Sequence, residues 1–232
     1  MKRLILIAVS ALLMCACTDY LGQLEDDYPS VGKGDFVGKF VDVDGQEYKT
    51  VTIGKQTWMA QNMNYAGSSG TIKCLYDYYF ENLDACSMFG RLYSKYEAER
   101  ICPEGWSLPT ENDVIELNNT LLKKYGDYFA AMKADYSWET LEGVSYKGSN
   151  RSGFELLPTG LYADGEFYEI NETGMFWTKS SEYHAFDDGS YVMADIAFGV
   201  STTDDMLSYS SIPEYHIMQS ADYRLPVRCI KK

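Results

Sequence analysis

The sequence predicts an α+β fold, and three observations support this class. First, the chain has 232 residues, 46% of them hydrophobic and 15% aromatic, which suits a single domain with a substantial core. Second, helical periodicity is concentrated in the first half of the chain. Third, the second half consists mainly of short apolar runs separated by Gly-containing turn signals, which is typical of antiparallel strands.

A nine-residue stretch, Cys-Pro-Glu-Gly-Trp-Ser-Leu-Pro-Thr at positions 102–110, contains most of the local signals on which this prediction depends. Its Pro-Glu-Gly part predicts a turn. The alternation of Trp106 and Leu108 with Ser107 predicts a short strand with one buried face. Thr110 is expected to be the N-cap of a helix, with Asp113 as its partner in a capping box.

The helix that follows is expected over residues 111–124. Its apolar residues recur at helical spacing and should form one buried side: Val114, Leu117 and Leu121. Gly126 lies just beyond the helix and is a common stop signal. A second capping box, formed by Ser94 and Glu97, predicts a shorter helix that ends at Ile101.

Turn signals divide much of the remaining chain into strands. Asp44-Gly45, Gly54-Lys55 and Asp164-Gly165 each predict a hairpin. Further strands are predicted at residues 176–178, as a central strand of a sheet, and at residues 191–197 and 225–230. Residues 130–147 give an ambiguous pattern in which Trp138 is the one strong anchor.

The first residues have the pattern of a secretory signal. Lys2 and Arg3 precede an eleven-residue apolar run that is too short to span a bilayer. The run ends in Met-Cys-Ala-Cys, and a small residue before a cysteine resembles the preference of lipoprotein signal peptidases. We therefore expect cleavage after residue 16 and lipidation of Cys17, with Cys15 or plain secretion as alternatives.

This interpretation divides the chain into a signal peptide (1–16), a lipidated polar tether (17–35) and one domain (36–232). It predicts an exported lipoprotein that is anchored in the cell envelope, at the outer membrane, through its acyl chains alone.

Four further cysteines belong to the predicted domain: Cys74, Cys86, Cys102 and Cys229. In an oxidising compartment this even set can pair in three ways, and the sequence does not choose between them. We favour Cys74–Cys86 with Cys102–Cys229, which gives one local loop and one link between the end of the domain and its middle.

Several motifs occur in order along the chain and use rare residue types. They are residues 44–65 (Asp-Gly-Gln-Glu-Tyr through Gln-Asn-Met-Asn-Tyr), Phe89-Gly-Arg-Leu-Tyr93, the stretch 102–110, Gly153-Phe154 with Leu157-Pro158 and Gly160, Trp177-Thr-Lys-Ser-Ser181, and Val227-Arg-Cys-Ile230. Together they resemble the Fibrobacter succinogenes major paralogous domain over about residues 36–232. Gln61 and Ser107 depart from this pattern, where Glu and His are common.

The resemblance implies a variant of the C-type lectin fold: two helices packed on a twisted antiparallel sheet, with close chain ends, a long loop region and disulfide staples. It also implies an exported bacterial lipoprotein. The calcium-binding runs of true C-type lectins, Glu-Pro-Asn or Gln-Pro-Asp and Trp-Asn-Asp, do not occur in the sequence, so we expect no metal site and no cofactor.

A sugar site without calcium could use aromatic side chains, because tyrosine presents an apolar plane with a polar edge. The candidate ligand-binding residues are Tyr162, Tyr168, Tyr183, Asp187 and Asp188. The two aspartates fall where lectin calcium loops would lie, and we interpret them mainly as solvated loop acids. Trp177 has a strand pattern and is expected in the core.

These observations predict a binding module without catalysis that recognises a glycan or an envelope protein through residues 160–222. The chain has only two histidines and lacks His-x-x-His, Cys-x-x-Cys and Gly-x-Ser-x-Gly motifs, which argues against zinc sites and hydrolase chemistry. A net charge of −14 without an evident basic face argues against nucleic-acid binding. The alternatives are a structural or assembly component of the envelope and a thiol enzyme of the formylglycine-generating kind.

Overall fold

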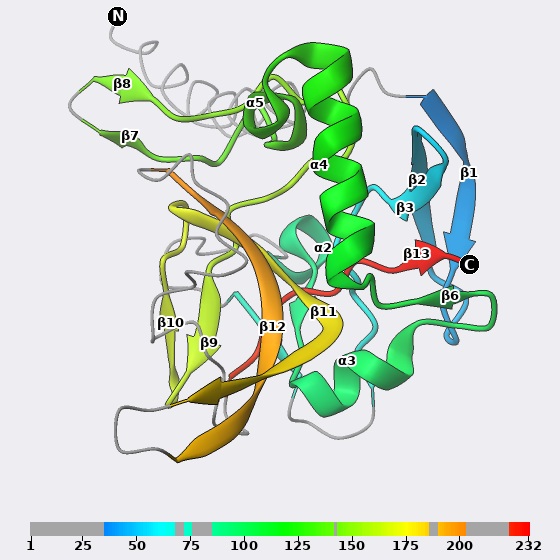
Figure 1. Ribbon diagram of the computed structural model, residues 1–232, viewed down its shortest axis with the longest axis vertical. Helices are drawn as coiled ribbons and strands as arrows, with labels where there is room; N and C mark the ends of the chain where they lie inside the picture. The colour runs from blue at the N-terminus through cyan, green and yellow to red at the C-terminus, as the bar shows by residue number, and fades with distance from the viewer. Residues whose placement is uncertain (1–34, 68–71, 76–84, 142, 186–189, 203–222) are drawn as a thin grey trace, which may run out of the picture. The chain divides into compact units, whose positions relative to one another are not determined.

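The computed structural model describes residues 35–67, 72–75, 85–141, 143–185, 190–202 and 223–232 (Figure 1). Helices and strands are mixed, with more strands than helices, which confirms the predicted α+β class. The largest sheet is antiparallel and has the strand order β1-β2-β3-β13-β6. Its strands are β1 (Asp35–Val41), β2 (Glu47–Ile53), β3 (Gln56–Met59), β13 (Ile230–Lys231) and β6 (Trp106–Ser107).

All three predicted hairpin turns are present. Gly45 connects β1 to β2 with φ +84°, and Gly54 connects β2 to β3 with φ +62°. Asp164 and Gly165 both have positive φ, 49° and 95°, between β9 (Leu161–Ala163) and β10 (Glu166–Tyr168). Turns that contain residues with positive φ match the twist of the strands they connect. These short sequence signals therefore correctly predicted strand pairing.

The two predicted helices are also present, with their capping boxes. They are α3 (Lys95–Ile101), capped by Ser94 and Glu97, and α4 (Glu111–Tyr125), capped by Thr110 and Asp113. Gly126 ends α4 in the left-handed conformation with φ 76°. Val114, Leu117 and Leu121 are fully buried, as their spacing predicted.

The expectation of two helices is wrong, because the described residues contain two more: α2 (Ala85–Phe89) and α5 (Tyr128–Met132). Each has five residues, which is too short for a periodic apolar pattern to develop. No helix in the described part of the chain combines the length and the apolar composition needed to cross a membrane.

The C-terminal part forms a long hairpin of β11 (Thr173–Ala185) and β12 (Tyr191–Ser201). Residues 176–178 were predicted to be a central strand, but β11 pairs with β12 alone among the described strands. Phe176 is buried by ring contacts with Trp58, Phe154 and Phe198. The apolar run is therefore explained by side-chain packing, and not by neighbouring strands on both sides.

Three smaller features complete the fold. Short two-stranded ladders are formed by β4 (Lys73–Cys74) with β5 (Arg91–Leu92) and by β7 (Thr140–Leu141) with β8 (Val144–Ser145). The predicted strand 225–230 is reduced to β13, preceded by a single bridge between Leu225 and Tyr93. Pro226 cannot donate to a ladder, which limits pairing there.

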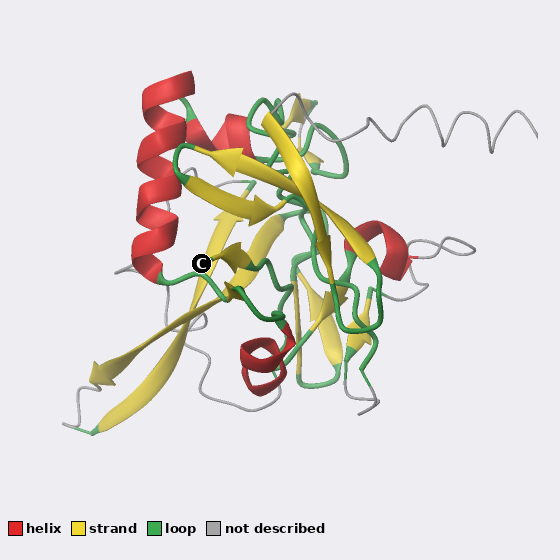
Figure 2. Ribbon diagram, turned by 90° about the vertical axis from the view of Figure 1, so that its right-hand side faces the viewer, coloured by secondary structure: helices red, strands yellow, loops and turns green. Residues whose placement is uncertain are grey.

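A bulge in β11 divides the long hairpin into two halves. Trp177 faces Ala197 and Ser181 faces Asp195, so three residues of β11 lie opposite the single residue Ile196 of β12. The bulge is fixed to the start of α4: Lys179 N donates to Pro109 O at 2.7 Å, and Glu111 N donates to Ser180 Oγ at 3.0 Å. The Trp-Thr-Lys-Ser-Ser motif thus holds the base of the hairpin, and the distal half projects away at lower left in Figure 2.

The side chain of Arg228 is fully buried and joins three segments. Its Nε donates to Asn62 Oδ1 at 2.6 Å, and Nη2 donates to Glu155 O at 2.7 Å. Nη1 donates to the carbonyl oxygens of Phe154 and Met59. Burial lowers the pKa of the guanidinium to about 10, which still leaves it charged at neutral pH.

Both favoured disulfides are present, so this choice among the three possible pairings is confirmed. Cys74–Cys86 joins residues 12 positions apart with a Cα–Cα distance of 5.2 Å, and Cys102–Cys229 joins residues 127 positions apart at 5.9 Å. The second bond links the end of α3 to the residue before β13, and thereby fixes the C-terminal strand in the first sheet.

The two disulfides should contribute unequally to stability. Replacing Cys102 and Cys229 by alanine should lower the free energy of unfolding by about 5 kcal/mol, because the bond closes the longer loop of the denatured chain. The matched replacement of Cys74 and Cys86 should cost about 3 kcal/mol. Urea denaturation of both variants checks this; equal losses would contradict it.

Candidate functional site

The distal half of the β11–β12 hairpin presents one exposed face that carries large apolar side chains. Directly opposed residues share a face of a ladder, as do residues two apart on one strand. The pairs Ser181–Asp195, Tyr183–Met193 and Ala185–Tyr191 therefore lie on the same side, and we call these six residues the distal face. Tyr183 is 74% exposed, Tyr191 71% and Met193 49%.

The polar end of the distal face is held by α3. Asp195 Oδ1 accepts from Ser181 Oγ at 2.9 Å and from Lys95 Nζ at 3.0 Å. Lys95 lies in the first turn of α3, and its ammonium is also 5.9 Å from the centroid of the Trp177 ring. The charge of Asp195 is thus compensated within the fold, and the adjacent aromatic surface has no uncompensated carboxylate at this end.

The predicted tyrosines do not form one cluster. Tyr162 and Tyr168 both lie in the β9–β10 hairpin, but on opposite faces of it, because Tyr162 pairs with Phe167 and Tyr168 pairs with Leu161. Tyr162 packs against Phe167 with ring centroids 5.1 Å apart, whereas Tyr168 is 47% exposed. Trp177 is in the core, as expected.

Four of the predicted site residues lie outside the described residues: Cys15, Cys17, Asp187 and Asp188. Lipidation and the role of the acidic pair stay predictions.

Sequence reasoning missed Tyr191 and Met193. The strand 191–197 was recognised, but its register against β11 could not be read from the chain. Only the pairing with Tyr183 and Ala185 shows that these side chains extend the same surface. The run Tyr191-Val192-Met193 is apolar throughout, so it gave no alternation from which the exposed face could be read.

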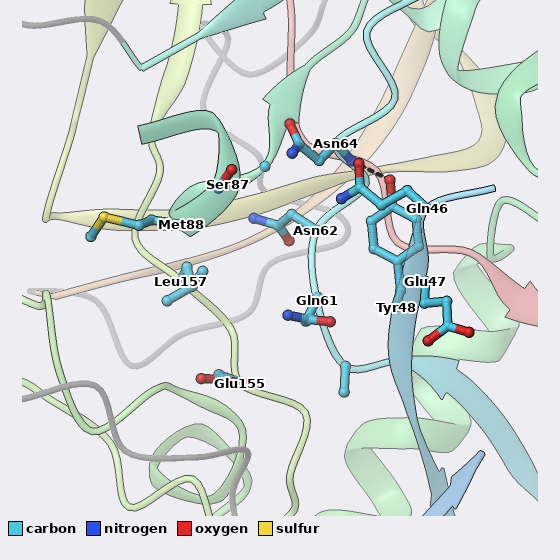
Figure 3. A pocket seen from close by; sticks show the side chains of 12 residues that line it. Gln46, Glu47, Tyr48, Gln61, Asn62, Asn64, Ser87, Met88, Glu155 and Leu157 are labelled. Carbon is cyan, nitrogen blue, oxygen red and sulfur yellow. Dashed lines mark hydrogen bonds between the residues drawn. The ribbon is translucent and has the colours of Figure 1, made fainter. Parts of the chain in front are cut away.

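A second candidate is a polar pocket beside β2 and β3 (Figure 3). Its polar lining includes the amides of Gln46, Gln61, Asn62 and Asn64 and the carboxylates of Glu47 and Glu155. The cavity volume is about 50 Å³, which admits water but is far below the 300 Å³ or more that small-molecule sites usually offer.

Most polar groups of this pocket already serve the fold. Asn62 accepts from Arg228 and donates to Phe89 O, and Gln61 Oε1 accepts from Lys49 N. Asn64 Oδ1 is buried without a partner in the described part of the chain, and pocket water would satisfy it. We interpret the pocket as a hydrated junction around Arg228.

Metal binding has no support from the clustering of side chains. Within the described ranges, no group of three or more His, Cys, Asp and Glu side chains is placed to hold a metal ion.

Glu155 is the buried carboxyl group of the pocket. It is buried, has a positive φ of 56°, and accepts a hydrogen bond from Tyr136 Oη at 2.7 Å. Desolvation by burial raises its pKa above the ordinary value of 4.5, although Tyr136 and the nearby Arg228 charge act in the opposite direction. The neutral acid is therefore the form that this site favours.

The raised pKa of Glu155 predicts a pH-dependent contribution to stability. Its contribution should be fully present below pH 4.5 and decrease as the pH rises through the pKa of the folded state. The Glu155→Gln variant lacks this titration. Its unfolding free energy minus that of the wild type should therefore increase from pH 4 upwards and then level off. A difference that decreases with pH in urea denaturation would contradict the prediction.

Comparisons with known proteins place most of the chain in one family. The family model described as the Fibrobacter succinogenes major domain matches residues 51–231, from the middle of β2 to the end of β13. The searches of curated proteins and of solved structures found no match.

Proposed function

This chain belongs to the Fibrobacter succinogenes major domain family, and from that premise we propose that it is a non-catalytic module that binds a glycan through the distal face. One observation carries the proposal: Tyr183, Tyr191 and Met193 are about half or more exposed on the same side of a projecting hairpin. Contiguous exposed apolar patches larger than a few hundred Å² often mark binding sites.

The chemistry of the distal face favours a neutral glycan over a charged partner. Tyrosine rings offer apolar planes to the C–H faces of sugar rings, and their hydroxyl groups can hydrogen-bond to sugar hydroxyls. Ser181 and Asp195 add hydrogen-bonding groups at one end, and the ion pair with Lys95 compensates the only carboxylate of the face. Binding of this kind requires no metal ion.

The same proposal includes export and attachment. We infer that residues 1–16 are removed and that Cys17, or alternatively Cys15, is lipidated, which would anchor the domain at the outer membrane. We also infer that the domain is a variant of the C-type lectin fold. The sheet order β1-β2-β3-β13 supports this fold, since it places the first and the last strand of the described domain in one sheet.

A thiol enzyme of the formylglycine-generating kind is the least supported alternative. That chemistry needs a reactive cysteine pair, whereas all four domain cysteines pair in disulfides and Cys229 is fully buried. A structural role in the envelope, through a protein partner, remains the alternative that the experiment must separate from glycan binding.

The test is a glycan array probed with the oxidised chain, with calcium and with chelator in parallel. Binding should survive chelation. Replacing Tyr183 and Tyr191 together by alanine should weaken it by about tenfold or more, since each aromatic contact contributes about 0.5–1.5 kcal/mol.

The matched control is Tyr96→Ala, which removes a tyrosine that is 69% exposed on α3 and is not part of the distal face. It should leave glycan binding unchanged. Loss of binding in chelator would mean that a metal takes part. A blank array, combined with an envelope protein that co-purifies with the wild type and not with the double variant, would replace the glycan by a protein partner.

A further inference from the structure

A cavity with an aromatic lining lies at the other end of the described fold, at the C-terminal end of α4. It is formed by the last turn of α4, by α5 and by the segment after β8, which come together at the upper end of α4 in Figure 1. Its volume is about 430 Å³, within the range of small-molecule sites. Tyr128, Phe129 and Tyr146 line it together with the apolar side chain of Leu122.

The walls of this cavity are fixed by backbone contacts. Gly148 N donates to Ala134 O at 2.7 Å, Ser149 N to Ala130 O at 2.6 Å, and Asn150 N to Lys133 O at 3.1 Å. A Cβ atom on Gly148 would lie 2.2 Å from Lys133 O, so only glycine allows this approach. The segment that carries Tyr146 is therefore held against α5, and the cavity is preformed.

The aromatic rings are accessible from the cavity. Tyr128, Phe129 and Tyr146 are all half-buried, and the rings of Tyr128 and Phe129 pack together with centroids 4.1 Å apart. The Tyr146 hydroxyl has no hydrogen-bond partner among the described residues, so it is available to a ligand. The cavity thus offers apolar planes with at least one polar edge.

Basic groups surround the cavity, although the chain as a whole has a net charge of −14. Lys133 and Lys147 line it; Lys133 is buried with its ammonium 4.1 Å from the centroid of the Trp138 ring, whereas Lys147 is exposed. At the last turn of α4, Lys124 Nζ and the Arg151 guanidinium lie 5.1 and 5.2 Å from the centroid of the Tyr125 ring. Within the described part of the chain, no carboxylate forms an ion pair with Lys124, Lys147 or Arg151.

The lining contains one acidic residue, Asp127, against two lysines. Asp127 is the N-cap of α5, and its Oδ1 accepts from Ala130 N at 3.0 Å, so its carboxylate is held at the start of that helix. The cavity therefore combines an apolar floor with a local excess of positive charge, and it favours a ligand that has a flat apolar face and one anionic group.

We propose that this cavity binds a single acidic sugar residue of the uronic acid type, with its ring against Tyr128, Phe129 and Tyr146 and its carboxylate at Lys147. A pyranose ring presents C–H groups to aromatic planes, and a ring-borne carboxylate pairs with an ammonium group. A polyanion such as a nucleic acid would need basic groups along an extended track, whereas the net charge of the chain repels it. The site is independent of the distal face.

Calorimetric titration of the purified, oxidised full chain tests the proposal. The probes are galacturonate and glucuronate, with galactose and glucose as neutral counterparts and 4-hydroxybenzoate as an aromatic carboxylate. Both uronates should bind up to about fivefold more tightly than the neutral sugars, because one exposed ion pair contributes up to about 1 kcal/mol. Their affinity should decrease as salt is added.

Two variants separate the charge from the aromatic contact. Lys147→Met should lower uronate affinity about fivefold and leave the weak binding of neutral sugars unchanged. Tyr146→Ala should lower the affinity for uronates and neutral sugars alike, by about tenfold. Tyr146→Phe, which keeps the ring, should retain most of the affinity, and urea denaturation of Tyr146→Ala shows whether its loss comes from folding.

The matched controls are Lys123→Met, which removes an exposed lysine of α4 that does not line the cavity, and the double variant of Tyr183 and Tyr191. Neither should change uronate binding. Equal affinity for uronates and neutral sugars, absence of uronate binding at millimolar concentration, or preference for 4-hydroxybenzoate would overturn the proposal. The double variant alters only the distal face, so the two sites are tested separately. A failure of uronate binding leaves the proposal for the hairpin intact, and a failure of glycan binding at the hairpin leaves the proposal for the cavity intact.

Discussion

The burial of Arg228 is the constraint on which the rest of the structure depends. A guanidinium inside a protein is strongly destabilising unless its donors are satisfied. Here they reach Asn62 and Met59 from the N-terminal part of the chain and Phe154 and Glu155 from its middle. Four neutral acceptors therefore have to converge on one side chain near the C-terminus, and this fixes three distant segments relative to one another.

Two other features extend that constraint across the domain. The neighbouring Cys229 is bonded to Cys102, so the C-terminal strand is joined to the segment that leads into α4. Pro109 and Glu111, on either side of the α4 N-cap, then hydrogen-bond to the bulge of β11. The motifs that resemble the family are thus connected into one framework, which ends at the base of the hairpin. Their role in this chain is therefore mainly structural.

The sequence predicted those parts of the fold that are encoded locally. Thr110 with Asp113 and Ser94 with Glu97 satisfy helix termini over three residues, and Asp164-Gly165 sets a turn by backbone preference alone, so each could be read without a partner. The wrong assignment of residues 176–178 concerns non-local packing: Phe176 gives the pattern of a central strand, yet aromatic rings cover it.

The same distinction applies to the candidate sites. Tyr183 was recognised by residue type, but its neighbours Tyr191 and Met193 depend on register. The aromatic cavity lies in a region that gave an ambiguous pattern, and its basic groups come from separate segments around residues 124, 133, 147 and 151. Charge counted along a chain cannot show that folding gathers such residues at one corner.

The bulge in β11 also divides the hairpin into two parts of different local stability. Below it, Phe176, Trp177 and Phe198 are buried, so opening that part would expose core to water. Beyond it, the strands have mainly each other and exposed side chains, so the free energy of local opening is much smaller. A ligand that binds at the tip therefore has to offset the conformational entropy of a segment that can open on its own, while the framework below stays closed.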